Sequence, residues 1–157
     1  MTTQEITKVT QPSRLGTLRR SIVRWARRRS IWVLHYNSGG CNGCDIEILD
    51  LLTPRYDVER LGILKEGSPR HADVLLCTGP VTRQSRARLA QIHAQMPEPK
   101  WVVAVGSCAT SGGVFQGGIN VLGGIDQVLP VDLYIPGCPC RPEAIIDGIV
   151  KLVELIP

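Results

Sequence analysis

Residues 101–108 read Trp-Val-Val-Ala-Val-Gly-Ser-Cys, an uninterrupted apolar run that ends at a glycine and a cysteine. A run without polar alternation is typical of a strand that is covered on both faces of a parallel sheet. Similar runs occupy residues 31–36, 72–78 and 133–135, and an alternating segment at 56–63 predicts one more strand. Helical spacing or helix-start signals mark residues 45–52, 82–96 and 142–156. The chain is therefore predicted to form an open, doubly wound α/β domain with about five parallel strands.

Length and composition are those of one globular domain. The chain has 157 residues, of which 43% are hydrophobic and 20% charged, and a chain of this size buries about two-thirds of its unfolded surface. No window of about 18 residues is free of charged side chains, which argues against a membrane-spanning helix. Aromatic residues make up only 4%, so side chains on which nucleic-acid bases could stack are scarce.

Charge divides the chain into two parts. Residues 1–36 hold 8 of the 18 Lys and Arg residues but only 1 of the 14 Asp and Glu residues, a net charge of +7. Residues 37–157 hold the other 10 basic and 13 acidic residues, a net charge of −3. We therefore expect a basic N-terminal arm over residues 1–30 and a domain over residues 31–157.

Within the arm, Leu15, Leu18, Ile22 and Trp25 recur at helical spacing, which predicts a basic helix over Arg14–Arg29. Such a helix could be solvated and docked on its own domain, lie at an anionic membrane surface, or dock on another subunit. A nucleic-acid contact is disfavoured because the body of the chain lacks a basic patch. No apolar export segment precedes or follows these arginines, so we expect the six cysteines to be reduced, metal-bound or buried in a reducing compartment.

Four cysteines follow the predicted strands directly. Cys41 and Cys44 come after the run at 31–36, Cys108 after the run at 101–105, and Cys138 after the run at 133–135. The carboxyl ends of parallel strands open on one crevice, where ligands bind. Glycines beside these cysteines let the backbone approach a bulky group closely. The sequence therefore predicts that these four thiols converge.

Four thiolates suit either one zinc ion or an iron–sulfur cluster. The single Cys-x-x-Cys pair with two separate cysteines, on a sheet that has its own core, favours the cluster over zinc. The remaining alternative is four unrelated buried cysteines. Cys77 lies inside an apolar strand, where core packing is the expected role. Cys140 follows Cys138 after one proline and competes with it for the fourth position.

Two other titratable residues lie near the predicted crevice. His35 ends the first strand and could form a hydrogen bond close to the thiols. Glu47 lies three residues after Cys44, where it could either complement a helix N-terminus, as we expect for Asp45 and Asp50, or relay protons at a subunit interface. The segment 106–130 is expected to be a long glycine-rich loop, and loops of that length are usually functional.

These motifs resemble a known family. Gly40-Cys41-Asn42-Gly43-Cys44-Asp45-Ile46-Glu47, Gly106-Ser107-Cys108 and Pro136-Gly137-Cys138-Pro139 are similar to the electron-transferring small subunit of nickel–iron hydrogenases, in a wider family with the B-type subunit of respiratory complex I. The similarity extends over residues 31–156. It implies a flavodoxin-like fold that holds one 4Fe–4S cluster, with Cys41, Cys44, Cys108 and Cys138 as ligands by motif position.

The branch within that family follows from finer features. Complex I subunits have two adjacent cysteines at the first position, whereas this chain has Cys-x-x-Cys, as hydrogenase small subunits do. The further cluster-binding cysteines and export signal of the longer uptake hydrogenases are absent from it. The chain therefore resembles the small subunit of membrane-bound, energy-converting hydrogenases.

That resemblance implies a peripheral position on the cytoplasmic side of the membrane. It also implies a one-electron relay between a Ni–Fe large subunit, which holds the H₂-reacting site, and a ferredoxin-like iron–sulfur subunit, anchored to membrane subunits. A complex I-type relay that delivers electrons to a quinone is the alternative. A zinc-organised interaction module is the alternative of another class.

Overall fold

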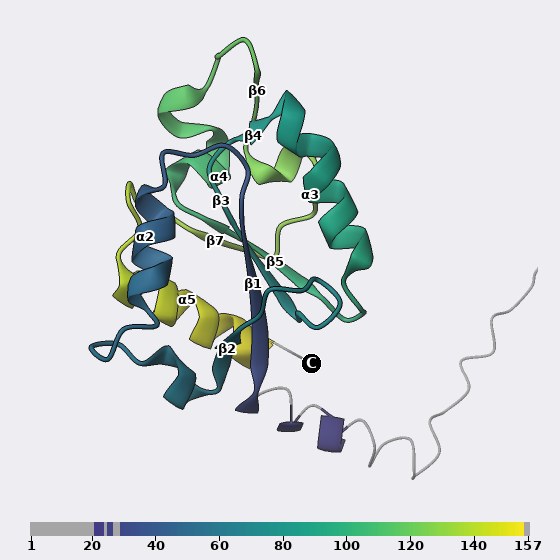
Figure 1. Ribbon diagram of the computed structural model, residues 1–157, viewed down its shortest axis with the longest axis vertical. Coiled ribbons are helices and arrows are strands. Elements are labelled where there is room, and N and C mark those ends of the chain that lie inside the picture. The colour runs from purple at the N-terminus through teal and green to yellow at the C-terminus, as the bar shows by residue number, and fades with distance from the viewer. Residues whose placement is uncertain (1–20, 24, 27–28, 156–157) are drawn as a thin grey trace, which may run out of the picture.

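The computed structural model describes residues 21–23, 25–26 and 29–155. The main sheet has five parallel strands in the order β2-β1-β3-β5-β7 (Figure 1). The strands are β1 (Ile31–Asn37), β2 (Ile63–Lys65), β3 (Val74–Thr78), β5 (Trp101–Val105) and β7 (Leu133–Ile135). Counted along the chain, this is the order 2-1-3-4-5 of flavodoxin-like sheets. The predicted open, parallel α/β fold is confirmed.

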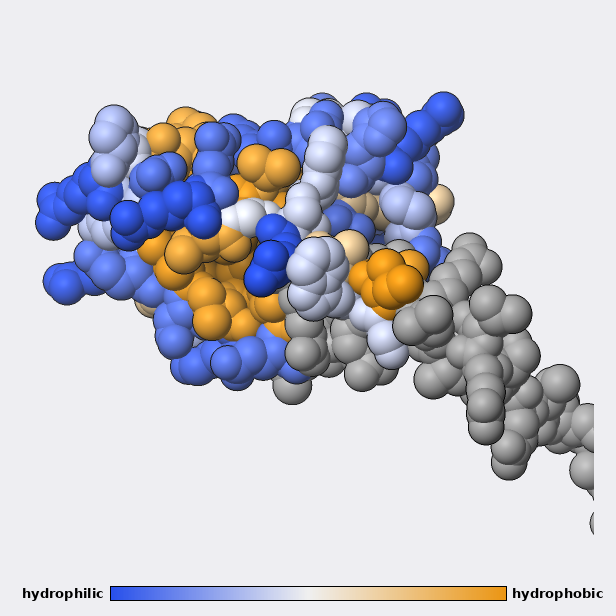
Figure 2. All heavy atoms as spheres, turned by 90° about the horizontal axis from the view of Figure 1, so that it is seen from below, coloured by the Kyte–Doolittle hydropathy of each residue, from blue (hydrophilic) through white to orange (hydrophobic). Residues whose placement is uncertain are grey.

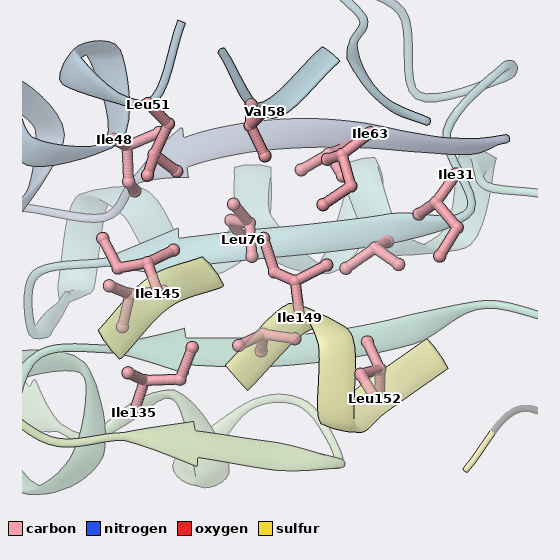
Figure 3. Packing of buried hydrophobic residues seen from close by; sticks show 14 of the residues in the cluster. Ile31, Ile48, Leu51, Val58, Ile63, Leu76, Ile135, Ile145, Ile149 and Leu152 are labelled. Atoms are coloured by element: carbon pink, nitrogen blue, oxygen red, sulfur yellow. The ribbon is translucent and has the colours of Figure 1, made fainter. Parts of the chain in front are cut away.

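Helices cover both faces of the sheet. They are α2 (Gly43–Asp50), α3 (Arg83–Gln95), α4 (Ser107–Ser111) and α5 (Pro142–Leu155). The two faces alternate along β3: Val74 and Leu76 pack on the side of α2 and α5, whereas Leu75 and Cys77 pack on the side of α3. Figure 3 shows the first of these clusters, where Ile145 and Ile149 of α5 point at the sheet. Because every residue of β3 is buried, its sequence has no polar alternation.

The carboxyl ends of four strands lie in register. Asn37 pairs with Thr78, Thr78 with Val105, and Val105 with Ile135. The loops that leave these residues therefore begin on one line across the sheet, at the top of the view in Figure 1.

Two expectations about local structure are wrong. Within residues 56–63, Val58–Leu61 forms a 3₁₀ helix (η1), and the strand begins only at Ile63. Asp57 and Gly62 flank this turn in the left-handed region, with φ of 43° and 83°, which a strand does not permit. The alternating pattern therefore reflects a turn in which only Val58 is buried.

The segment 106–130 is not one long loop. It contains α4, two further 3₁₀ helices, η2 (Gly113–Phe115) and η3 (Ile125–Gln127), and strand β6 (Val121–Gly123), which pairs with β4 (Val81–Thr82). These elements are three to five residues long at most, too short to produce a recognisable period.

The predicted basic helix is only partly described. Residues 21–23, 25–26 and 29 are helical, whereas residues 14–20 lie outside the described part. The side chains of Ile22 and Trp25 are 57% and 59% exposed, so the larger part of each faces solvent. Within the described ranges, we find no helix that combines the length and the apolar character needed to cross a membrane.

Candidate metal centre

The turn between β1 and α2 lies backbone to backbone against the turn after β3. A Cβ atom on Gly40 would lie 2.8 Å from the Cα atom of Gly79, closer than side chains permit. Gly79 itself has a φ of 73°, which favours glycine. The glycines therefore allow the loop that carries Cys41 to sit directly on the sheet end.

The structure brings three cysteine-bearing loops together. The Sγ atom of Cys44, in the first turn of α2, lies 2.6 Å from the position that a Cβ atom on Gly106 would occupy. The Sγ atom of Cys41 and the Cβ atom of Pro139, which follows Cys138, both lie 3.5 Å from the equivalent position on Gly43. The loops after β1, β5 and β7 thus meet, with the two sulfur atoms directly against glycine backbone.

Cys108 completes this group from the first turn of α4. Its Sγ atom lies 3.0 Å from the position of a Cβ atom on Gly113. Cys108 and Cys44 are half-buried, whereas Cys41 and Cys138 are exposed. The four thiols therefore lie at the surface end of the sheet, where a bound group could exchange electrons with a neighbour.

The four sulfurs influence one another electrostatically. Burial raises the pKa of Cys108, and the neighbouring Cys138 and Cys41 raise it further. Burial also raises the pKa of Cys44, with smaller contributions from Cys108 and Cys41. Free thiols at these two positions are protonated at neutral pH, so a metal group that binds them must displace their protons.

The other two cysteines differ from this group. Cys77 is fully buried on the α3 side of the sheet, and burial raises the pKa of its thiol to about 12. Cys140 is also buried, and its Sγ atom donates to the carbonyl oxygens of Ile135 and Pro136 at 3.6 and 3.3 Å. The thiol of Cys140 is thus engaged by its own loop, whereas Cys138 is exposed.

The two candidate metal groups make different demands on their sulfur ligands. Among the described residues, no three His, Cys, Asp or Glu side chains are placed to hold one metal ion. A zinc ion needs its sulfur ligands about 2.3 Å from the metal, whereas the thiolates of an iron–sulfur cluster bind different irons and lie further apart. Four cysteine thiols on loops that meet at glycine backbone are the soft donors that such a cluster uses.

A polar network lies under the first cysteine loop. The Nε2 atom of His35 pairs with the Oδ1 atom of Asp45 at 2.5 Å, and the hydroxyl of Thr78 donates to the same oxygen at 2.6 Å. Burial lowers the pKa of His35, opposed by Asp45 and assisted by Lys65. The amide of Asn37 donates to the other carboxylate oxygen of Asp45 at 2.6 Å.

Sequence reasoning missed most of this network. The sequence predicts His35 near the crevice and Asp45 as charge at a helix terminus, and it suggests no role for Asn37 or Thr78. Their only sequence signal is position, since Asn37 and Thr78 each end a strand. Glu47 is half-buried and lies close enough to Cys140 to contribute to the raised pKa of that thiol, after burial and Cys44.

Comparisons with known proteins identify the family. The family model described as NADH ubiquinone oxidoreductase, 20 Kd subunit, matches residues 41–152. A probable membrane-bound hydrogenase subunit of Pyrococcus furiosus is 56% identical over 126 residues, covering 80% of this chain and 75% of that protein. The B-type subunit of the NADH-quinone oxidoreductase of Citrifermentans bemidjiense is 47% identical over 136 residues, covering 87% of this chain and 78% of that protein.

A solved structure agrees with these matches. The structure of an archaeal respiratory membrane complex, the membrane-bound sulfane sulfur reductase, contains a chain that is 43% identical with a TM-score of 0.76, covering 86% of this chain and 75% of that one. The fold, the cysteine-bearing loops and these similarities agree, and the chain belongs to the family of the 20 kDa subunit of NADH ubiquinone oxidoreductase.

Proposed function

We propose that this chain holds one 4Fe–4S cluster through Cys41, Cys44, Cys108 and Cys138 and relays single electrons within a membrane-associated hydrogenase complex. The observation that carries the proposal is the meeting of the loops after β1, β5 and β7, where the sulfur of Cys44 lies directly on the backbone of Gly106. When bound, a cluster of this class accepts and returns electrons singly.

The residues of this chain would bind and tune that group. Burial raises the pKa of both Cys44 and Cys108, and backbone hydrogen bonding from Cys140 and from Val114, respectively, lowers it in part. Hydrogen bonds to ligand sulfur stabilise the thiolate and raise the potential of the group that it holds. The half-buried positions of Cys44 and Cys108 limit water on the inner side of the site.

The proposed partners are a Ni–Fe large subunit, which would contain the H₂-reacting site, a ferredoxin-like iron–sulfur subunit and membrane subunits. The similarity to the Pyrococcus protein, a probable membrane-bound hydrogenase subunit, supports this assignment. Large apolar side chains near the cysteines support a protein interface: Ile46, two residues after Cys44, and Val114, beside Cys108, are 65% and 83% exposed. Glu47 is the candidate for proton relay at that interface.

We place the chain at the cytoplasmic face of the membrane, with residues 1–30 as an arm and residues 31–157 as the cluster domain. Figure 2 shows the end of the molecule opposite the cysteine loops, where apolar surface is exposed within a polar rim. Exposed Leu61 of η1 and exposed Trp25 of the basic segment are consistent with contacts to other subunits. Deletion of residues 1–30 should release the chain from the membrane fraction while leaving its iron content unchanged.

A complex I-type relay to a quinone is the second candidate. The 47% identity to the B-type subunit of an NADH-quinone oxidoreductase favours it. Assays of the native complex separate the two, because the hydrogenase relay predicts H₂ evolution and a partner with two Cys-x-x-Cys pairs. Quinone reduction without H₂ turnover would reverse the order of the two candidates.

Metal analysis and electron paramagnetic resonance test the site itself. The purified full chain should be brown, contain about four iron atoms and give the signal of a reduced cluster. Cys108→Ser should abolish or convert that signal, whereas Cys77→Ser, which alters a thiol on the α3 side of the sheet, should leave it intact. A colourless protein with zinc would favour the interaction module, and a normal spectrum from Cys108→Ser would reject the ligand assignment.

A further inference from the structure

Asn37, the last residue of β1, uses its whole side-chain amide. Its Oδ1 atom accepts hydrogen bonds from the backbone N–H groups of Gly39 and Gly40 at 2.8 and 2.7 Å. Its Nδ2 atom donates to the Oδ1 atom of Asn42 at 2.8 Å and to the Oδ2 atom of Asp45 at 2.6 Å. An amide offers two donor hydrogens and two acceptor positions, so none of its hydrogen-bonding capacity is left over.

These four bonds reach both cysteine-bearing segments of the first motif. Gly40 and Asn42 flank Cys41 in the sequence, and Asp45 directly follows Cys44. Asn42 has a φ of 66° and occupies the N-cap position of α2, but its side chain does not cap the helix. The bond to Asn37 therefore replaces the usual role of that side chain and ties the left-handed residue to the end of the sheet.

Asp45 is held from the other side as well. Its Oδ1 atom takes the hydroxyl of Thr78 and the imidazole of His35, which project from β3 and β1. Asp45 and His35 are only 14% and 16% exposed, so these bonds are largely shielded from water. The first turn of α2, which carries Cys44, is thereby attached to two strands of the sheet.

We propose that Asn37 is the positioning residue of this centre, and that its amide sets the separation of Cys41 and Cys44 by joining the backbone of Gly39 and Gly40 and the side chain of Asn42 to the carboxylate of Asp45. This inference rests on the proposed function, since it concerns how the chain presents two of the four thiols. These bonds need an acceptor atom toward Gly39 and Gly40 and a donor atom toward Asp45. An amide side chain provides both, whereas a carboxylate provides acceptors only.

An exchange of the two side chains tests this requirement. Asn37→Asp places a carboxylate against that of Asp45 and removes the donor. The double variant Asn37→Asp with Asp45→Asn restores the pairing in reverse, because the new aspartate accepts from Gly39, Gly40 and the new amide, and Asn42 keeps its bond by turning its own NH₂ group toward the new carboxylate. Asn120→Asp, an exposed asparagine in the segment before β6, is the control for the added negative charge.

The experiment uses the full chain, loaded anaerobically with iron and sulfide. Iron per chain, the rate of cluster loss to a chelator and the resonance spectrum are measured, together with circular dichroism. Loss of a residue that orients a metal ligand commonly weakens binding by roughly 10- to 100-fold. We therefore expect Asn37→Asp to lose its cluster faster by that factor and to show an altered spectrum, whereas the exchange variant and Asn120→Asp resemble the wild type.

The outcomes distinguish the positioning role from the cluster proposal. Wild-type iron retention and spectrum in Asn37→Asp would overturn the positioning role while leaving the cluster proposal intact. An exchange variant that folds but does not regain the wild-type spectrum would also overturn it, whether or not Asn37→Asp alone folds. A wild-type chain that takes up no iron would remove the proposed function first, and the positioning role with it.

Discussion

Replacement of Gly106 by alanine tests the contact on which the site depends. Gly106 has a φ of 89° and a ψ of 161°, a backbone region that costs other residues about 1–3 kcal/mol. Its new Cβ atom would lie 2.6 Å from the Sγ atom of Cys44 and 3.4 Å from the carbonyl oxygen of Gly137. Overpacking of this kind adds about 1–3 kcal/mol. We expect the free energy of unfolding to fall by about 2–6 kcal/mol, a large share of the roughly 5–15 kcal/mol typical of a domain.

Variants of two other glycines separate the two contributions to this loss of stability, backbone strain and overpacking. Gly117 has a similar φ of 83° but no atom within 4 Å of its Cβ position, so Gly117→Ala reports backbone strain without a contact. Gly67 has neither feature, and Gly67→Ala should change stability by less than about 0.5 kcal/mol. Equilibrium unfolding in denaturant and iron per chain are measured for all three variants under anaerobic conditions.

Two results would contradict the expected role of Gly106. If Gly106→Ala matched Gly117→Ala in both stability and iron content, Cys44 would not lie against this backbone, and the convergence of the loops after β1 and β5 would be wrong. If Gly106→Ala lost stability but retained iron, the contact would be real but unrelated to metal binding.

Three more outcomes follow from the packing and the titrating groups. Burial lowers the pKa of both His35 and His93, so below about pH 6.5 the unfolded chain binds more protons than the folded chain. The free energy of unfolding should therefore fall as the pH drops through this range, and His35→Gln should make the denaturation midpoint less sensitive to pH. Gly148→Ala should destabilise α5 by about 1–3 kcal/mol, although alanine has the better helix propensity, because the new Cβ atom lies 2.5 Å from the Cδ1 atom of Ile135. Ile135→Val deletes that atom and should reduce the loss of stability. If the effects of the two substitutions simply added in the double variant, this would contradict the contact. Leu76→Ala, at a side chain 2% exposed, should cost about 2–5 kcal/mol in thermal or chemical unfolding, and a loss below about 1 kcal/mol would contradict the assignment of Leu76 to the core.

The local pattern of the strands was readable because it reflects burial. Trp101–Val105 and Leu133–Ile135 lie in the structure where their apolar runs predicted strands. The same rule failed at Val58, where one buried residue in a turn imitates the alternation of a strand. It also failed after Gly106, since elements of three to five residues leave no period to recognise.

The candidate site was predictable in its residue types but not in its supports. Cys44, Cys108 and Cys138 could be named because each follows a strand end, and parallel strands bring their ends to one edge. Asn37 and Asp45 carry no such signal. Their partnership spans eight residues along the chain, and that of Asp45 with Thr78 spans 33, so neither exists until the loop folds back on the sheet.

Burial and strand-end position are properties of each segment. Side-chain polarity predicts the first, and the order of glycine and cysteine after an apolar run indicates the second. This is why the chain alone specified a parallel sheet with thiols at one edge. The closeness of Cys44 to Gly106 and the four hydrogen bonds of the Asn37 amide depend instead on tertiary structure. They require that β1, β3 and β5 align and that each loop folds back onto the end of the sheet. Such contacts join residues with independent local preferences, and they arise only when the packed core holds the strands at one register.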